Sequence, residues 1–195
     1  MKIFSELKKL SKHLERWDGA WAICGGVAAS LYRETPRFTA DIDIALVSQG
    51  NRSAEEIAHL VIESLGYTPY IGFVPSLDGS DQQTRAMISY RLENNAKFVG
   101  IDFLLPAFPW VHQAVIRAQN NLVDCGFATL PTVTIEDLLL AKISALADSS
   151  SRLYDKDDIL SIIKHQKEID FPYIQRIASE LRITIPAWVS LTQPS

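Results

Sequence analysis

Hydrophobic residues follow two different spacings along the chain, and each spacing predicts one kind of element. Short apolar runs that end at glycine, proline or aspartate are typical of buried strands, whereas apolar residues three or four positions apart indicate amphipathic helices. Residues 2–16 show the helical spacing, with Phe4, Leu7, Leu10 and Leu14 on one face and lysines between them. We expect this helix to pack its leucines on the domain; the alternative is that its basic face touches RNA or a partner.

Strands alternate with helices over the first 130 residues. Ser53 and Glu56 have the spacing of a capping box, so a helix is expected to begin there and to end at Gly66. Two β-rich runs, 85–92 and 97–105, are joined by a polar turn and predict a hairpin. The remaining runs predict strands at 20–24, 42–47, 67–74 and 123–130, and helices at 27–33 and 110–119.

From Pro131 onward the pattern is helical. Thr134, with Asp137 three residues later, predicts one helix start, and Asp170 followed by Pro172 predicts another. The chain is therefore expected to have an α/β (α+β) fold, in which a mixed β-sheet core flanked by helices is followed by a helical C-terminal part that closes a cleft. The expected division is 1–130 for the core and 131–195 for the helical region, with 186–195 as a partly ordered tail.

The composition fits an ordinary soluble globular protein, with 47% hydrophobic and 22% charged residues. No apolar run approaches the ~20 residues that span a bilayer, and the N-terminus lacks the apolar core of a signal peptide. Two distant cysteines suggest no disulfide framework, so we expect a cytoplasmic protein. The net charge of −4 gives no broad attraction to nucleic acid, although it is compatible with a local basic groove. The Walker, dinucleotide-binding and zinc-protease motifs are absent, and the four histidines lack zinc spacing.

The densest chemistry lies between residues 23 and 45. Asp41 and Asp43 stand two positions apart at the start of a predicted strand, so their side chains project from the same face. Carboxylates this close repel each other unless a cation lies between them, and hard oxygen ligands beside open space suit Mg²⁺ with substrate phosphates. Gly25 and Gly26 offer free N–H groups without a Cβ at a helix start, which is what a phosphate needs. Without the carboxylates, the glycine pair would be more typical of a plain strand-to-helix connection.

Other polar residues are open to both a functional and a structural interpretation. Arg37 and Thr39 either form a salt bridge and a strand position, or lie beside the metal site, where Arg37 contacts phosphate or orders Asp43. Lys142 falls in the apolar stripe of its helix, so its ammonium either reaches the rim or meets an anion inside. Asp102 interrupts an apolar strand and needs a partner there, unless it lies at an edge in water.

Asp155 and Asp158 form a further acidic pair on a predicted helix. Their spacing places Asp155 on the inward side of this helix, whereas Asp157 points elsewhere. The two carboxylates either contribute to a nucleotide site or pair with Arg152 or Lys142 in a purely structural network. The residues alone leave both interpretations open.

The order of a glycine pair, a short helix and Asp-Ile-Asp resembles the signature of the nucleotidyltransferase (polymerase-beta-like) superfamily. Later stretches make the chain similar to the AbiEii-type nucleotidyltransferases, a group known as toxin components of toxin–antitoxin and phage-defence systems. The matching stretches occur in the right order: Gly25-Gly26, Arg37 to Asp43, Asp102, Glu136 to Lys142, and Arg152 to Ile159.

This resemblance implies a transfer of NMP from an NTP to an acceptor hydroxyl of RNA, tRNA or protein, with Mg²⁺ (or Mn²⁺) as cofactor and a cognate antitoxin as partner. Asp102 would complete the metal site with Asp41 and Asp43 and take the proton from the acceptor hydroxyl. Lys142 would neutralise the departing pyrophosphate. The expected nucleotide contacts are Gly25, Gly26, Arg37, Thr39, Lys142, Asp155 and Asp158.

Two other functions fit the same sequence. One is a small-molecule transferase such as an antibiotic adenylyltransferase, which shares the metal site and differs only in its acceptor. The other is a non-catalytic regulatory or antitoxin module on the same fold, although three crowded aspartates argue against an inactive site. The sequence names neither the NTP base nor the acceptor.

Overall fold

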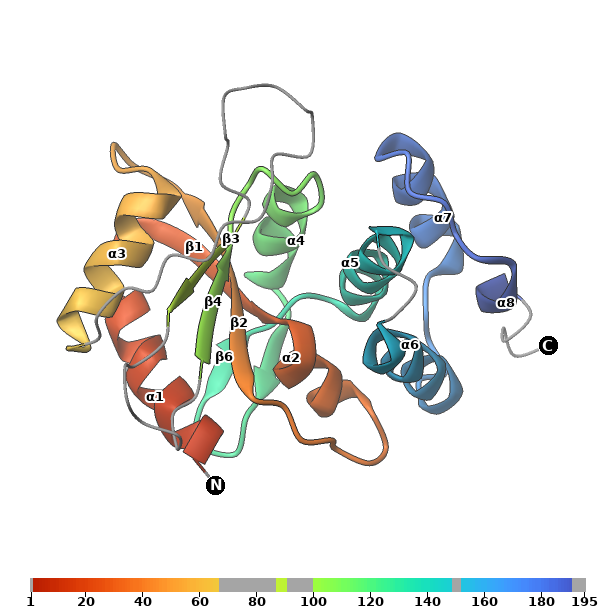
Figure 1. Ribbon diagram of the computed structural model, residues 1–195, viewed down its shortest axis with the longest axis horizontal. Coiled ribbons are helices and arrows are strands. Elements are labelled where there is room, and N and C mark those ends of the chain that lie inside the picture. Colours follow the sequence, from red (N-terminus) through yellow and green to blue (C-terminus); the bar gives the residue numbers. More distant parts are fainter. Residues whose placement is uncertain (1, 67–86, 91–99, 149–151, 191–195) are drawn as a thin grey trace.

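A mixed four-stranded sheet forms the centre of the N-terminal part of the chain in the computed structural model (Figure 1), which describes residues 2–66, 87–90, 100–148 and 152–190. The strands are β1 (Gly19–Cys24), β2 (Asp41–Ser48), β3 (Met87–Tyr90) and β4 (Gly100–Leu104). Strand β2 lies between antiparallel β1 and parallel β4, and β3 is antiparallel to β4. The last pairing confirms the predicted association of the runs 85–92 and 97–105. The connecting turn and the predicted strand at 67–74 lie outside the described residues.

Helices α1 (Lys2–Leu14) and α3 (Ala54–Ser64) cover one face of the sheet, and α2 (Gly25–Tyr32) and α4 (Val111–Ala118) cover the other (Figure 1). The three leucines of α1 are buried, which confirms the predicted amphipathic helix. The predicted cap of α3 is present as well, because Glu56 N–H donates to Ser53 Oγ at 3.1 Å and Ser53 N–H donates to Glu56 Oε2 at 2.7 Å. The sheet core thus follows directly from the hydrophobic pattern.

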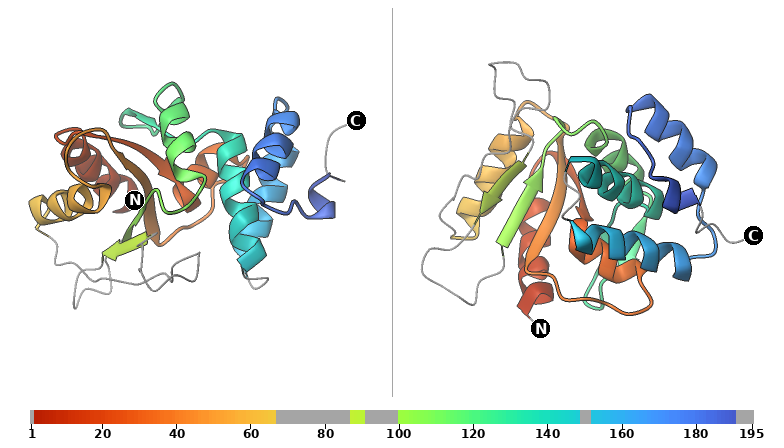
Figure 2. Two further views of the ribbon diagram at one scale, coloured as in Figure 1. Left: turned by 90° about the horizontal axis from the view of Figure 1, so that it is seen from above. Right: turned by 45° about the vertical axis from the view of Figure 1, so that its right-hand side comes forward.

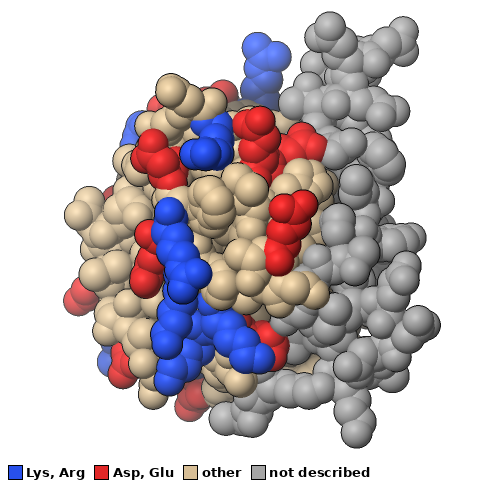
Figure 3. Space-filling model, turned by 90° about the vertical axis from the view of Figure 1, so that its left-hand side faces the viewer, with Lys and Arg blue, Asp and Glu red and all other residues tan. Residues whose placement is uncertain are grey.

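The outer face of α1 is basic, with Lys8, Lys9, Lys12 and the following Arg16 exposed. Figure 3 views the side of the molecule on which α1 and α3 lie, and it shows Lys and Arg side chains in a band between acidic ones. This band lies across the sheet from α2. Contact of this basic face with RNA or a partner stays a prediction, and any such contact would form away from α2.

A two-stranded hairpin follows α4, where the sequence had predicted one strand over 123–130. It consists of β5 (Leu122–Asp124) and β6 (Thr129–Pro131). The chain reverses at Gly126, which has φ +79° and whose N–H donates to Asp124 Oδ1 at 2.7 Å. The prediction of a single strand was wrong because an Asp-x-Gly turn needs only a few residues to reverse the chain.

The C-terminal region contains four helices among the described residues, and they lie together beyond α2 and α4 (Figure 2). Thr134 and Asp170 cap the first and the third of them: Asp137 N–H donates to Thr134 Oγ1 at 3.3 Å, and Tyr173 N–H donates to Asp170 Oδ1 at 2.8 Å. The helices are α5 (Ile135–Asp148), α6 (Leu153–His165), α7 (Phe171–Glu180) and α8 (Ala187–Ser190).

Helices α5 and α6 attach this region to the sheet core through contacts with α2. The division at residue 131 into a core and a helical region stays a prediction. The predicted partly ordered tail contains the short helix α8, in which Val189 is buried, at 2% exposed, and belongs to the hydrophobic core. Residues 191–195 lie outside the described part. No helix among the described residues is long and apolar enough to cross a membrane.

Candidate active site

The junction between β1 and α2 is so tight that only glycine fits at two consecutive positions. Gly25 has φ +57°, and a Cβ placed there would overlap the carboxylate of Asp43. A Cβ on Gly26 would lie 2.5 Å from Thr39 Oγ1. This close approach lets the Gly26 N–H donate to Asp43 Oδ2 at 3.2 Å. The start of α2 therefore faces the carboxylates of β2 directly.

Three carboxylates project from the same face of the sheet on adjacent strands. In the parallel register of β2 with β4, Asp43 lies opposite Asp102 and Asp41 lies opposite Gly100. Paired residues of neighbouring strands point to the same face, so the two aspartates of β2 and the one of β4 are neighbours. Gly100 has no side chain, which leaves space beside Asp41.

The electrostatics of this face are clearest at Asp43. Burial raises the pKa of Asp43 to about 6, and the charges of Asp102 and Asp41 add to this effect. The Gly26 N–H and the ammonium of Lys142 act in the opposite direction without cancelling it. A nearby cation would stabilise the ionised form of this carboxyl group and lower its pKa.

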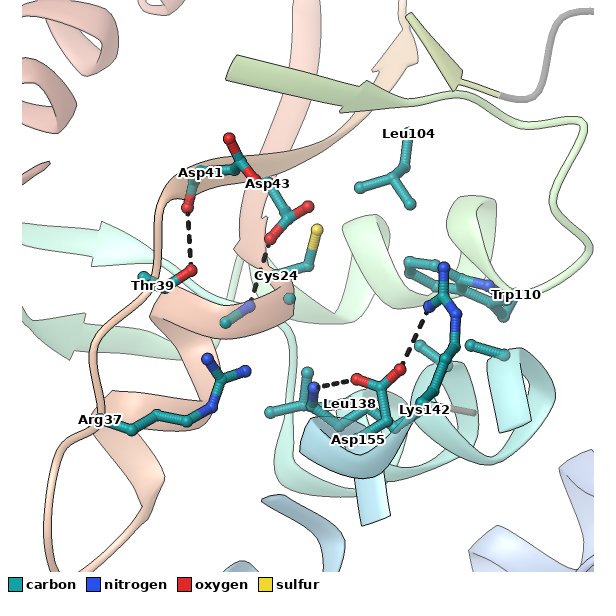
Figure 4. A pocket seen from close by; sticks show the side chains of 15 residues that line it. Cys24, Arg37, Thr39, Asp41, Asp43, Leu104, Trp110, Leu138, Lys142 and Asp155 are labelled. Atoms are coloured by element: carbon teal, nitrogen blue, oxygen red, sulfur yellow. Dashed lines mark hydrogen bonds and ion pairs between the residues drawn. The ribbon is translucent and has the colours of Figure 1, made fainter. Parts of the chain in front are cut away.

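A pocket of about 230 Å³ opens in front of the carboxylates of β2 (Figure 4). Residues of β1, α2 and β2 form one wall, and residues of α5 and the start of α6 form the opposite wall. The pocket is lined by Cys24, Gly25, Gly26, Arg37, Thr39, Asp41, Asp43, Leu104, Trp110, Leu138, Ala141, Lys142, Ala145, Arg152 and Asp155.

The wall opposite the glycine junction carries two cations that are held by acids (Figure 4). Lys142 is only 5% exposed, and its Nζ lies 2.8 Å from Asp155 Oδ1 and 2.7 Å from Asp158 Oδ2. Arg152 Nη1 lies 3.1 Å from Asp155 Oδ2. The ammonium therefore meets anions inside the structure, as one of the two interpretations of its position in the apolar stripe predicted.

Asp158 is the centre of an ion cluster that joins α6 to the segment after α2. Arg37 binds its carboxylate through two hydrogen bonds of 2.7 Å, donated by Nε and Nη2, and Arg33 Nη1 donates to it at 2.6 Å. Asp158 is fully buried, and burial alone would raise its pKa. The hydrogen bonds from Arg37 and the charge of Lys142 outweigh burial and hold the pKa of Asp158 below its usual value.

Comparison with known proteins adds a family to this geometry. A family model described as "Nucleotidyl transferase AbiEii toxin, Type IV TA system" matches residues 10–180, which include the glycine junction, the sheet carboxylates and the ion cluster of α6. The chain belongs to the AbiEii nucleotidyltransferase family. No protein with curated annotation matches it significantly in sequence.

Solved structures with the same fold agree with this family. One is an antigenic nucleotidyltransferase-like protein from Paracoccidioides brasiliensis, with a TM-score of 0.59, 16% identity and coverage of 94% of each chain. Another is the antibiotic-resistance factor ANT(2'')-Ia, with a TM-score of 0.55, 12% identity and coverage of 92% of this chain and 90% of that one. At these identities the similarity shows a nucleotidyltransferase fold and no more.

In this AbiEii-family chain the pocket brings together all of the predicted site residues except Asp102 and Asp158. Asp102 lies opposite Asp43 on the neighbouring strand and is buried, with 8% of its surface exposed. Asp158 is fully buried behind the residues of the pocket wall. Arg37 forms a salt bridge with Asp158, as one of the two interpretations of this residue predicted. Asp43 accepts a hydrogen bond from the Gly26 N–H. The structural network proposed for the acids of α6 is present in this state. Whether the same residues also contact nucleotide stays a prediction.

Arg33, Leu104 and Trp110 are among the contributors to the site that sequence reasoning missed. Arg33 belongs to the ion cluster, and no local pattern could have found it, because its partners Asp157 and Asp158 lie on α6. Leu104 and Trp110 form an apolar part of the pocket lining, and both lie close to the prolines that end β4. Their position follows from the course of that loop, which the hydrophobic pattern does not specify.

No group of three or more His, Cys, Asp or Glu side chains within the described parts of the chain is arranged to hold a metal ion. Mg²⁺ is usually bound through one or two carboxylates together with waters and substrate phosphates, and seldom by a cage of protein ligands alone. The hard oxygen donors of Asp41 and Asp43, beside a pocket and under mutual repulsion, are of the type that Mg²⁺ prefers. The donor set therefore fits this ion.

Proposed function

We propose that the chain transfers a nucleotidyl group from an NTP to an acceptor hydroxyl, with Mg²⁺ or Mn²⁺ as cofactor. The observation that carries the proposal is the placement of Asp41 and Asp43 in one pocket with a glycine junction, with Asp102 in register beside them. The family match supports a transferase of this class. The metal dependence and the acceptor belong to the proposal.

The glycine junction is suited to hold the phosphates of the NTP. The Gly26 N–H already donates to a carboxylate, which shows that an anionic oxygen fits in front of the start of α2. In the proposed complex, phosphate oxygens lie at this helix start. Glycine at both positions is required by the approach of Asp43 and Thr39, so the backbone there is held in one conformation.

The sheet carboxylates provide the metal ligands and the base. When bound, the metal would neutralise charge on the triphosphate and polarise the reacting phosphate. Asp41 and Asp43 would hold it, and Asp102 would support this site and accept the proton from the acceptor hydroxyl as it attacks the α-phosphate in line. The raised pKa of Asp43 is consistent with this assignment, since burial raises it most and the charges of Asp102 and Asp41 add to the effect.

The cations of α5 and α6 are suited to the charge of the leaving pyrophosphate. Lys142 lines the pocket and holds Asp155, which lines it too. In the proposed complex a phosphate oxygen replaces Asp155 on the ammonium, and Arg152 keeps the displaced carboxylate paired. Asp158 remains with its arginines and keeps α6 in place.

Label transfer tests the function. The protein is incubated with each α-labelled NTP, Mg²⁺ and cell extract, and the label is then sought in RNA, protein and small molecules. We expect labelled RNA or protein with the parent and none with Asp43→Asn. Asp157→Asn serves as the matched control, because its carboxylate is 61% exposed and does not line the pocket. Equal labelling by the parent and Asp43→Asn would show that the site is wrongly assigned.

The family description also supports a role as the toxin of a toxin–antitoxin system, with a cognate antitoxin as partner. Expression of the parent should then slow growth of the host cell, and Asp43→Asn should relieve this effect. Parent and variant that slow growth equally would contradict a toxic transferase. A label that enters only small molecules would instead favour the adenylyltransferase alternative.

A further inference from the structure

The three most exposed large apolar side chains of the described structure belong to two short segments, Arg37 to Thr39 and Arg152 to Asp155, whose first and last residues line the pocket; these two segments are called the rim. Phe38 is 88% exposed, Leu153 is 75% exposed and Tyr154 is 74% exposed. Phe38 stands in the chain between two residues that line the pocket, and so does the pair formed by Leu153 and Tyr154. Single exposed apolar side chains are normal on protein surfaces, whereas several that gather beside a pocket indicate a binding surface.

Arg37 connects the two exposed aromatic residues. Its Cζ lies 5.4 Å from the centre of the Tyr154 ring, and its Nη1 donates to the carbonyl oxygen of Phe38 at 3.0 Å. The other nitrogens of the guanidinium are fixed by the buried carboxylate of Asp158. The rim therefore presents the Tyr154 ring with the Arg37 guanidinium held over it, and the exposed side chain of Phe38 follows Arg37 directly in the chain.

The size of the pocket indicates what reaches this rim. Its volume of about 230 Å³ is below the ~300–1,000 Å³ that is usual for a pocket that encloses a drug-sized ligand. A nucleotide with its phosphates at the glycine junction would fill this space and leave other parts outside. A nucleobase that extends out of the pocket, or one that approaches it, would lie next to the rim residues.

We propose that Phe38 and Tyr154 form a stacking site for an unpaired nucleobase at the mouth of the pocket. Stacking on aromatic rings and arginine planes is how proteins hold bases that are not paired. Within the described parts of the chain, the apolar surface at the rim consists of three side chains, those of Phe38, Leu153 and Tyr154. Ionised residues flank it, among them Arg152, which is 56% exposed. This arrangement suits a base with a phosphate better than the broad apolar centre of a protein interface. The proposal rests on the proposed function, and the base belongs either to the NTP or to a polynucleotide acceptor.

Binding measurements with the full chain separate these two sources. The variants Phe38→Ala and Tyr154→Ala are compared with the parent in the presence of Mg²⁺. One set of probes is the four NTPs against inorganic tripolyphosphate, which has no base. The other set is a single-stranded RNA 12-mer of mixed sequence against the same backbone without bases. Tyr154→Phe keeps the ring, and Leu153→Ala removes a neighbouring apolar side chain that cannot stack.

We expect both alanine variants to bind at least one base-containing probe ~5- to 150-fold more weakly than the parent, with tripolyphosphate and the abasic strand unchanged. Tyr154→Phe should bind like the parent. A loss confined to the NTPs assigns the site to the incoming nucleotide, and a loss confined to the RNA assigns it to the acceptor.

Three results would overturn the stacking site. The first is unchanged binding of every base-containing probe by both alanine variants. The second is an equal loss for Leu153→Ala, which would indicate a general apolar docking surface for a protein partner. The third is that the parent binds tripolyphosphate as tightly as the NTPs, and the abasic strand as tightly as the RNA. If these results occur while label transfer still depends on Asp43, the proposed function stands without the stacking site.

Discussion

Two groups of three aspartates lie on either side of one pocket and have opposite electrostatics. On the sheet, burial and the neighbouring carboxylates raise the pKa of Asp43 to about 6. On α6, the arginines and the lysine around Asp158 hold its pKa below the usual value although it is fully buried. The two groups are Asp41, Asp43 and Asp102 on the sheet, and Asp155, Asp157 and Asp158 on the helix.

The difference lies in the partners and not in the acids themselves. The acids of α6 contact four basic side chains, so the group is nearly neutral and acts as a joint between α6 and the segment after α2. For Asp43, the cation that acts on it is Lys142, whose ammonium is paired with α6. A neutralised cluster is typical of structure, whereas a crowded one stores repulsion that a cation can relieve.

The largest expected effect comes from breaking the neutralised group. Asp158→Asn keeps the shape of the side chain but removes the charge that balances Arg33, Arg37 and Lys142. Removing one partner of a buried ion pair costs about 3–5 kcal/mol, because the remaining charges stay buried without compensation. Urea denaturation at pH 7 should show a loss of this size.

Asp157→Asn is the matched control for this measurement. Its carboxylate is exposed and contacts only the rim of the cluster through Arg33, so the loss should stay below about 1 kcal/mol. A variant of Asp158 that is as stable as this control would show that the cluster does not hold α6 in place.

An intermediate effect is expected from Lys142→Met. The substitution removes two charge-assisted contacts, while Asp158 keeps its arginines and Asp155 keeps Arg152. We expect a loss of about 1.5–3 kcal/mol in the free energy of unfolding. If the ammonium also meets the triphosphate, affinity for the NTP should fall more than affinity for the NMP.

Thermal melting and both titrations on Lys142→Met measure these two roles separately. Lys164→Met is a suitable control, because Lys164 is an exposed lysine of α6 outside the pocket lining. Equal weakening of NTP and NMP would contradict the phosphate contact. Unchanged stability would contradict the ion pairs as a source of stability.

The smallest expected effect comes from the three aspartates of the sheet, and here the substitution should increase the stability of the fold. The pKa of Asp43 is raised in the folded protein, so the stability that its protonated form contributes is present below pH ~4 and lost as the pH rises through about 6. Asp43→Asn cannot ionise and can still accept from the Gly26 N–H. At pH 7 without metal we expect it to be more stable than the parent by about 1–2 kcal/mol, after allowance for solvent screening.

Denaturation of both proteins between pH 4 and pH 8 without divalent metal tests this expectation. The stability of the parent should fall between pH 4 and pH 6.5 relative to that of the variant. Parallel pH profiles would show that Asp43 carries no unfavourable charge. Added Mg²⁺ with NTP should raise the melting temperature of the parent and leave that of Asp43→Asn unchanged.

Much of the sheet core was predictable from local pattern. The leucine stripe of α1, the capping box at Ser53, and the alternation of apolar runs with turns each depend on residues within about one turn or one strand. The hairpin β5–β6 was missed because its turn interrupts a run that is otherwise continuous in hydrophobicity. The short helix α8 was missed because its four residues are too few to show a helical spacing of apolar positions.

The sequence by itself determined which residues are the candidates for the chemistry. Two carboxylates at i and i+2 on a strand must share a face, and a glycine pair after a strand has no Cβ to obstruct access to its backbone N–H groups. These constraints are local, so they identified Asp41, Asp43 and the glycine junction before any fold was known. They also singled out Lys142 and the acids of α6 as polar residues in apolar surroundings.

Only the tertiary structure decided how these charges are paired. The partners of Asp158 lie more than a hundred residues away for Arg33 and Arg37, and on a different helix for Lys142. The register of β2 with β4, which sets Asp43 beside Asp102, is likewise a long-range pairing. An aspartate's pKa and role depend on the charges within a few ångströms of its carboxylate. Folding brings those charges from distant parts of the chain, so the same residue type is crowded on the sheet and neutralised on α6.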